Sequence, residues 1–186
     1  FLSSKKPSYE NTTFILIARM LWDKGVGEFV GAAKNVKALY PNVKFQLLGP
    51  LGVQNPTSIP ENKIQEWESG GDIKYLGDTI DVRPYIEAAS CVVLPSYREG
   101  LSRVLLEASA MSRPVIASDV PGCREVVDDR ITGFLCEVRS VNDLTDKIVS
   151  FISLVSSFIK YFFPSKVKTG LPASLVFSLM NLTFNK

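Results

Sequence analysis

The sequence predicts an α/β fold, a Rossmann-like parallel sheet with helices on both of its faces. Two observations lead to this prediction. Short runs such as 14–18 and 91–94 are apolar throughout, which is typical of strands buried on both faces. These runs alternate with stretches in which apolar residues recur at helical spacing, as in folds built from strand–helix–strand units. The 186 residues, 46% of them hydrophobic and 22% charged, suffice for one domain with a sizeable core.

The expected elements follow one another in a regular order. Strands are expected at 14–18, 43–48, 73–76, 91–94, 114–117 and 133–135. Helices are expected at 23–40, 61–69, 81–89 and 101–111, near 124–127, and from 141 onward. Asp23 is a candidate cap of the first helix, and Pro41 ends it. Because ligands of such sheets bind at the carboxyl ends of the strands, the loops after residues 18, 49, 76 and 94 are expected to share one edge.

The composition divides the chain into three parts. Residues 1–11 are polar and are expected to form a linker, and residues 12–149 form the α/β domain. All 19 acidic residues lie at or before Asp146, whereas the last 40 residues carry none and hold six Phe. Residues 150–186 are therefore expected to be an atypical tail outside the core, either disordered or produced by a frameshift. The start at Phe1 without a leader suggests a fragment of a cytoplasmic protein.

Composition also excludes several kinds of function. The chain has no His, which removes any mechanism that needs an imidazole base or an imidazole metal ligand within it. Cys91, Cys123 and Cys136 form no CxxC pair, so they indicate free thiols rather than a zinc or redox site. A net charge of +2 is too small to favour nucleic acid as the partner.

The most informative stretch is 95–108, in which Glu99 and Glu107 are separated by seven residues. Helical geometry brings both carboxylates towards one face at the start of the helix expected at 101–111. The amides of Gly100, Leu101 and Ser102 then lack partners within the helix and can bind an anion. An anion site flanked by two carboxylates suits a nucleotide sugar, which has two phosphates between two polyols. The alternative is a pair of solvated helix-end charges.

A second group follows the first expected strand. Arg19 and Lys24 offer a guanidinium and an ammonium that suit a diphosphate and would neutralise it without a metal. The alternative for Arg19 is a plain surface charge. The nearby glycines have the wrong spacing for a dinucleotide site. Trp22 and Tyr97 are interpreted as packing residues rather than platforms for a base, and Arg98 and Arg103 as surface charges.

The motifs together resemble the C-terminal domain of the retaining glycosyltransferases of family 4, or group 1, which have the GT-B fold. The resemblance runs from about residue 13 to 148. It depends on Arg19 with Lys24-Gly25, on the two carboxylates after Pro-Ser-Tyr-Arg, and on Arg-Pro-Val-Ile-Ala at 113–117. Val-Pro-Gly-Cys-Arg-Glu at 120–125 is most similar to bacterial members that add an N-acetylhexosamine to lipid-linked surface sugars.

The resemblance implies a role for each matching residue. Arg19 and Lys24 would bind the diphosphate, Glu99 the transferred sugar, and Glu107 the ribose. The amides of Gly100 and Leu101 would hold phosphate, and the loop at Gly77 would lie near the base. The expected catalytic residues are Glu99, Arg19 and Lys24. The expected donor-binding residues are Arg19, Lys24, Gly77, Glu99, Gly100, Leu101 and Glu107.

The function expected from the resemblance is retaining transfer from a nucleotide sugar, either a UDP-N-acetylhexosamine or a UDP-hexose, with no metal or other cofactor. The acceptor, a glycan or a lipid-linked sugar, would bind a domain that lies outside this sequence, so the chain alone is expected to be inactive. Peripheral association with the inner face of the cytoplasmic membrane is an alternative to a wholly cytoplasmic location. The competing function is a non-catalytic module that binds a nucleotide sugar, or a subunit that works with a separate acceptor-binding chain.

Overall fold

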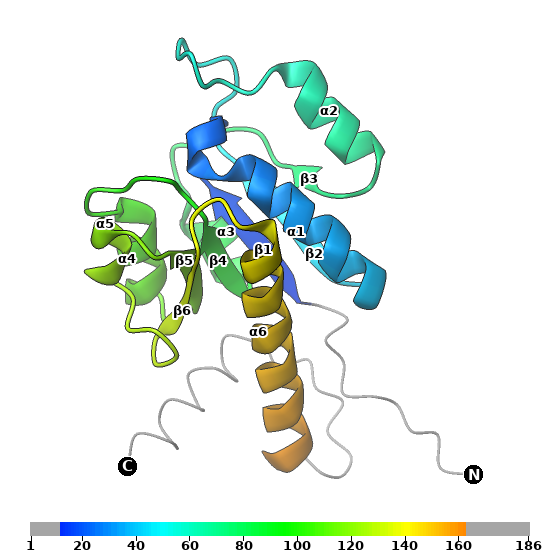
Figure 1. Cartoon of the computed structure of the whole chain (residues 1–186), viewed down its shortest axis with the longest axis vertical. Coiled ribbons are helices and arrows are strands. Elements are labelled where there is room, and N and C mark those ends of the chain that lie inside the picture. The colour runs from blue at the N-terminus through cyan, green and yellow to red at the C-terminus, as the bar shows by residue number, and fades with distance from the viewer. Residues whose placement is uncertain (1–11, 163–186) are drawn as a thin grey trace.

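The computed structural model describes residues 12–162, with side-chain surroundings described as far as residue 157. Within that part, six strands form one sheet with the order β3-β2-β1-β4-β5-β6, and every neighbouring pair is parallel (Figure 1). The strands are β1 (Thr13–Ile17), β2 (Lys44–Leu48), β3 (Lys74–Tyr75), β4 (Cys91–Leu94), β5 (Val115–Ser118) and β6 (Gly133–Cys136). This strand order confirms the predicted Rossmann-like fold.

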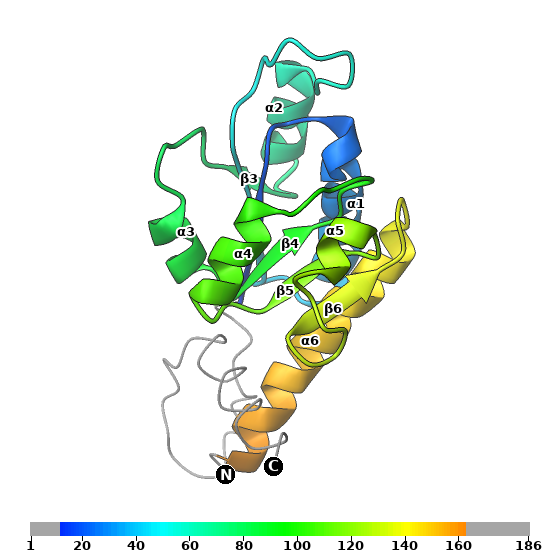
Figure 2. The same ribbon diagram turned by 90° about the vertical axis from the view of Figure 1, so that its left-hand side faces the viewer.

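Helices cover both faces of the sheet, as predicted (Figure 2). One face carries α1 (Val26–Leu39), α2 (Glu61–Ser69) and α6 (Val141–Phe162). The other face carries α3 (Arg83–Ala88), α4 (Arg103–Ala110) and α5 (Pro121–Arg124). A 3₁₀ turn, η1 (Trp22–Lys24), precedes α1.

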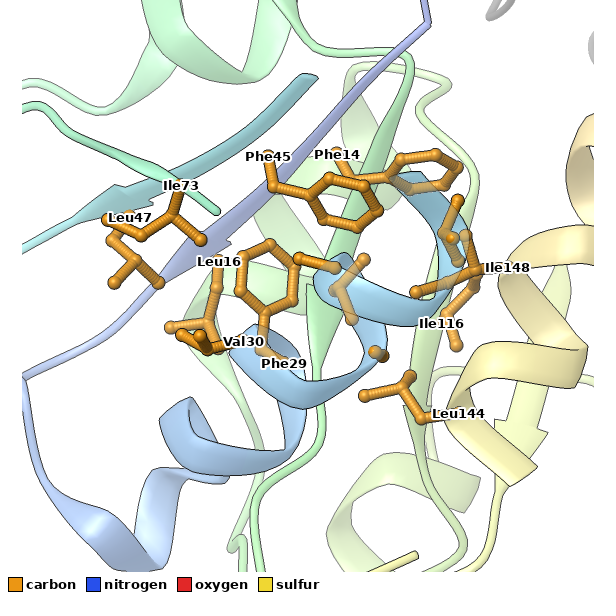
Figure 3. Close-up of a cluster of buried hydrophobic side chains, with 14 of the residues drawn as sticks. Phe14, Leu16, Phe29, Val30, Phe45, Leu47, Ile73, Ile116, Leu144 and Ile148 are labelled. Carbon is orange, nitrogen blue, oxygen red and sulfur yellow. The ribbon is translucent and has the colours of Figure 1, made fainter. Parts of the chain in front are cut away.

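The apolar run of β1 contributes to two hydrophobic cores, because successive side chains of a strand point to opposite faces. Phe14 and Leu16 lie in the core under α1 and α6, whereas Ile15 and Ile17 lie in the core under α3 and α4. The first core contains stacked and edge-to-face aromatic rings, with Phe45 at 5.3 Å from Phe14 between ring centroids (Figure 3). Burial on both sides explains why the strand lacks polar alternation.

The first helix differs from its predicted start. Gly25 has a left-handed backbone, with φ 71°, and separates η1 from α1, which begins at Val26 rather than at residue 23. Asp23 is therefore not the cap of α1. Its carboxylate accepts a hydrogen bond from Thr57 Oγ1 at 3.2 Å, in the loop between β2 and α2. The short helix expected near 124–127 lies slightly earlier, at α5.

The predicted boundary at residue 150 is wrong. Helix α6 crosses it without a break, and Phe151, Ile152 and Val155 are buried in the core with Phe14. Phe151 meets Phe14 edge-on, with ring centroids 5.6 Å apart. The rest of the expected tail, residues 163–186, lies outside the described residues, as does the expected linker 1–11. None of the helices described between residues 12 and 162 combines the length and the apolar character that a membrane span requires.

Candidate functional site

The loops that follow β1, β2 and β3 meet at one edge of the sheet, as the sequence predicts. Gly49, directly after β2, approaches the residue that follows β1 so closely that an added Cβ would lie 2.0 Å from the carbonyl oxygen of Ala18. Its N–H donates to the carbonyl of Gly77 at 2.8 Å, which connects this loop to the one after β3. Gly77 has φ 82°, a conformation that favours glycine. Gly77 therefore lies on the edge at which it was expected.

Lys24 and Glu99 come together at this edge from segments 75 residues apart. Lys24 Nζ lies 2.8 Å from Glu99 Oε1, and the two side chains are only 20% and 13% exposed. The backbones around them are also joined, because the N–H of Tyr97 donates to the carbonyl of Asp23 at 2.8 Å. Gly25 makes this approach possible, since an added Cβ would lie 2.0 Å from the carbonyl oxygen of Pro95.

Arg19 lies in the same loop as Lys24 but is more open to solvent. Its carbonyl accepts a hydrogen bond from the N–H of Leu21 at 2.8 Å, which turns the chain sharply after β1. The guanidinium is exposed, and within residues 12–162 it forms no ion pair. A second cation therefore accompanies Lys24 on this loop without a carboxylate that neutralises it.

The helix that follows Glu99 begins later than predicted. Ser102 stands at its N-cap and accepts the first helical hydrogen bond, from the N–H of Leu106 at 3.1 Å. The free amides of the first turn thus begin at about Arg103, and Gly100 and Leu101 are exposed residues of the preceding loop. The prediction that these two amides belong to the helix end is wrong, because the chain is still extended at Ser102.

The structure does not bring Glu107 into contact with Glu99. Glu107 lies in the middle of α4, 3.6 Å from the exposed guanidinium of Arg103 one turn earlier. Its charge also contributes to the raised pKa of Arg83 on α3, which is due mainly to the hydrogen bond with Asp81. The helical geometry predicted for the two carboxylates does not apply, because Glu99 lies four residues before the helix begins.

Two small residues that sequence reasoning missed support the Glu99 loop. Gly122, in α5, lies against it so closely that an added Cβ would be 1.8 Å from the carbonyl oxygen of Gly100 and 2.4 Å from that of Glu99. Ser96 is completely buried, and its hydroxyl lies within hydrogen-bond distance of the carbonyls of Asp23 and Arg98, at 3.2 and 3.1 Å. Both residues lie in motifs on which the family resemblance depends. Neither side chain has a charged or reactive group that would indicate, from sequence alone, a role in holding the Glu99 loop.

The charges at this edge affect neighbouring groups. Burial, together with the charge of Glu99, raises the pKa of Cys123 to about 12, although Lys24 opposes the shift. Cys123 is therefore a protonated, buried thiol, and the three cysteines are free as predicted.

Trp22 packs edge-on against Trp67, with ring centroids 5.8 Å apart, in agreement with its interpretation as a packing residue. The described residues contain no group of His, Cys, Asp and Glu that could hold a metal ion.

Comparison with known proteins identifies the family. Residues 11–153 match the family model of the glycosyl transferases group 1. Among curated proteins, the chain is 33% identical over 134 residues to the N,N'-diacetylbacillosaminyl-diphospho-undecaprenol alpha-1,3-N-acetylgalactosaminyltransferase of Campylobacter jejuni, covering 72% of this chain and 34% of that enzyme. It is 27% identical to the capsular polysaccharide biosynthesis glycosyltransferase CapM of Staphylococcus aureus, covering 82% of this chain and 40% of CapM. The chain thus spans well under half the length of these relatives.

A solved structure agrees with this assignment. A TarM variant from Staphylococcus aureus, in complex with Fondaparinux, alpha-GlcNAc-glycerol and UDP, superimposes with a TM-score of 0.67 at 26% identity. The match covers 77% of this chain and 29% of TarM. The matched family model, the curated relatives and the shared Rossmann-like fold agree with one another, and the chain belongs to the glycosyl transferases group 1 family.

Proposed function

We propose that this chain binds a uridine diphosphate sugar at the carboxyl edge of its sheet and presents the sugar for transfer with retention of anomeric configuration. The observation that carries the proposal is the partly buried contact between Lys24 and Glu99, 2.8 Å long, at the edge where such sheets bind ligands. A cation and a carboxylate are both needed there, one for the diphosphate and the other for the hydroxyls of the sugar.

The contact between Lys24 and Glu99 suggests how the two groups act on a donor. In this pair each charge neutralises the other. When a diphosphate arrives, Lys24 can turn to the phosphate oxygens, together with Arg19 from the same loop. Glu99 then has free lone pairs for sugar hydroxyls. The unpaired amides at the start of α4 add a further attraction for the anion. These groups supply the positive charge that the leaving UDP needs, so binding requires no metal.

The names of the relatives support a particular kind of sugar. The Campylobacter jejuni enzyme transfers an N-acetylgalactosaminyl group and forms an alpha-1,3 linkage. The TarM structure contains UDP and alpha-GlcNAc-glycerol. Because UDP-N-acetylhexosamines carry their sugar in the α linkage, α-linked products indicate retention. We therefore favour a UDP-N-acetylhexosamine over a UDP-hexose as the donor of this chain.

The acceptor is proposed from the same comparison. The Campylobacter jejuni relative acts on a sugar linked to undecaprenol through a diphosphate. A lipid-linked acceptor would bring the whole protein to the inner face of the cytoplasmic membrane. Since this chain spans 34% of that relative, we place acceptor binding in a part of the protein outside these residues. The chain alone would then bind the donor without transferring its sugar.

The first test is substitution of Lys24. We expect Lys24→Met to weaken the binding of UDP about tenfold or more, because a hydrogen bond between charged groups contributes roughly 1.5–3 kcal/mol. Isothermal titration calorimetry of the full chain with UDP measures this loss. Adding a chelator should leave the affinity of the unsubstituted chain unchanged.

Lys34 provides a matched control. It also lies next to a carboxylate, that of Asp72 at 3.3 Å, but on α1 away from the Glu99 loop. Lys34→Met should bind UDP as the unsubstituted chain does. If the folded chain gives no binding heat with UDP, UDP-N-acetylglucosamine or UDP-N-acetylgalactosamine at millimolar concentration, the proposed function is wrong.

A further inference from the structure

A second side-chain contact joins the Glu99 loop to α1. The hydroxyl of Tyr97 donates to Glu28 Oε1 at 2.7 Å, across 69 residues of sequence. Glu28 lies in the first turn of α1, directly after the segment that carries Lys24, and Tyr97 lies two residues before Glu99. The two segments that meet at Lys24 and Glu99 are therefore also joined at Glu28 and Tyr97.

The contact is partly buried, and a third residue lies against it. The second oxygen of Glu28, Oε2, is buried and has no hydrogen-bond partner within the described part of the chain. The guanidinium of Arg139, in the loop between β6 and α6, lies over the ring of Tyr97 at 4.5 Å from its centroid. Arg139 has φ 61°, which is uncommon for a residue other than glycine. Tyr97 is thus held by groups from two other parts of the fold.

Burial and the hydrogen bond to Glu28 raise the pKa of Tyr97 to about 12. The phenol therefore keeps its proton at neutral pH and remains a donor to the Glu28 carboxylate. The backbone strengthens the same connection, since the N–H of Tyr97 donates to the carbonyl of Asp23 at 2.8 Å. The main chain and the side chain of Tyr97 are thus both hydrogen-bonded to the segment 23–28. Glu99 follows Tyr97 by only two residues, so the position of Tyr97 limits where Glu99 can lie.

We propose that Tyr97 and Glu28 form a positioning pair, which holds the Glu99 carboxylate in the orientation that accepts hydrogen bonds from the sugar of the donor. The inference rests on the proposed function and deepens it. Neither residue touches the donor itself. We expect their effect to fall mainly on the sugar, because UDP alone would contact Arg19, Lys24 and the amides of α4 but not Glu99. A small displacement of a positioned group costs much of its effect on a bound substrate.

The test compares two ligands rather than one affinity. For each variant of the full chain, calorimetry gives the affinity for UDP and for UDP-N-acetylglucosamine or UDP-N-acetylgalactosamine, whichever the unsubstituted chain binds more tightly. We expect Tyr97→Phe to weaken sugar-nucleotide binding about fivefold and UDP binding by less than about twofold. A general loss of stability would weaken the binding of both ligands equally and leave the ratio of the two affinities unchanged.

Substitutions of Glu28 separate the hydrogen bond from the charge. Glu28→Gln keeps an acceptor oxygen and should retain the ratio of the unsubstituted chain, whereas Glu28→Met should match Tyr97→Phe. The two Glu28 variants give the same comparison of affinities if Tyr97→Phe does not fold. The double substitution should cause no further loss. Tyr85→Phe, on α3 across the sheet from α1, is the matched control and should change neither affinity.

The possible failures are distinct. In one, the chain binds both UDP and the sugar nucleotide, with the same ratio of the two affinities in Tyr97→Phe and Glu28→Met as in the unsubstituted chain. That result would overturn the positioning role of Tyr97 and Glu28 but not the proposed function. Equal losses for both ligands also overturn it, because they indicate a structural role. A folded chain that binds neither UDP nor either sugar nucleotide overturns the proposed function, and this inference with it.

Discussion

At the scale of single residues, the edge of the sheet depends on glycines that allow backbones to touch. Gly122 is the clearest case, because a Cβ there would lie 1.8 Å from the carbonyl oxygen of Gly100, and backbone cannot swing aside as a flexible side chain can. We expect Gly122→Ala to displace the Glu99 loop and to cost about 1–3 kcal/mol, as overpacking of a close contact does. For a chain of this size the melting temperature should fall by roughly 3–10 °C, and UDP-sugar binding should weaken with it.

Gly70 serves as the control for this substitution. It has φ −69° at the end of α2, and the contacts of an added Cβ begin at 3.4 Å, so alanine fits there. Gly70→Ala should leave melting and binding nearly unchanged. If Gly122→Ala melts and binds like the unsubstituted chain, the contact with Gly100 tolerates a methyl group and does not fix the loop.

Part of the candidate site could be predicted from the sequence. Lys24 and Glu99 each follow an apolar strand, so the sequence places both at one edge of the sheet, where the structure brings them into contact. The support from Gly122 was not predicted, since its partner is the backbone of a loop more than 20 residues away. The Tyr97–Glu28 contact joins two elements whose relative position follows only from the packed fold. Roles that depend on close tertiary contact leave little trace in local pattern.

At the scale of elements, α6 shows that composition can mislead. Acidic residues disappear after Asp146, and the core was therefore expected to end near residue 150. The buried apolar positions of the helix are Leu144, Ile148, Phe151, Ile152 and Val155, a helical spacing that continues across that boundary. The many apolar residues between 148 and 163 hide this periodicity in the sequence, because apolar side chains also occupy exposed positions such as Leu154. The start of α4 at Arg103 is not visible in the sequence, because neither Gly100 nor Leu101 forbids a helix.

The role of α6 can be measured with two substitutions on the same turn. Phe151 is fully buried, whereas Leu154 is 38% exposed. We expect Phe151→Ala to cost about 3–5 kcal/mol, as loss of a buried phenylalanine does, and to lower the melting temperature by roughly 6–20 °C. Leu154→Ala should change it much less. Thermal denaturation measures both changes. If the two substitutions lower the melting temperature by the same small amount, the helix contributes little to the core.

At the scale of the whole molecule, the topology was predictable because it follows from simple rules. Apolar strands that alternate with helices form a parallel sheet, and a parallel sheet brings its loops to one edge. The site draws on both faces, since Lys24 precedes α1 and Glu99 precedes α4. Such an edge can hold and orient a donor. Transfer also requires an acceptor held against the donor, at a distance of about 3–3.5 Å between the reacting atoms.

The last prediction concerns transfer by this chain alone. With UDP-N-acetylgalactosamine and an acceptor such as a sugar diphosphate linked to undecaprenol, we expect release of UDP no faster than that of Lys24→Met. The chain spans only 34% of its Campylobacter jejuni relative, and an acceptor that is not held beside the donor loses most of the rate advantage of an enzyme. Transfer clearly above that background would show that these residues bind the acceptor as well.

Absence of transfer agrees equally with an enzyme fragment and with a non-catalytic binding module, so a second measurement must separate them. In a chimera, residues 12–162 replace the matching segment of the Campylobacter jejuni enzyme, which supplies the rest of that protein. A donor half from an enzyme should restore sugar transfer, and Lys24→Met in the chimera should abolish it, because the leaving diphosphate loses its cation. A chimera that binds the sugar nucleotide with the affinity of this chain but transfers nothing would favour the binding module, since the donor would then be held without being oriented for reaction.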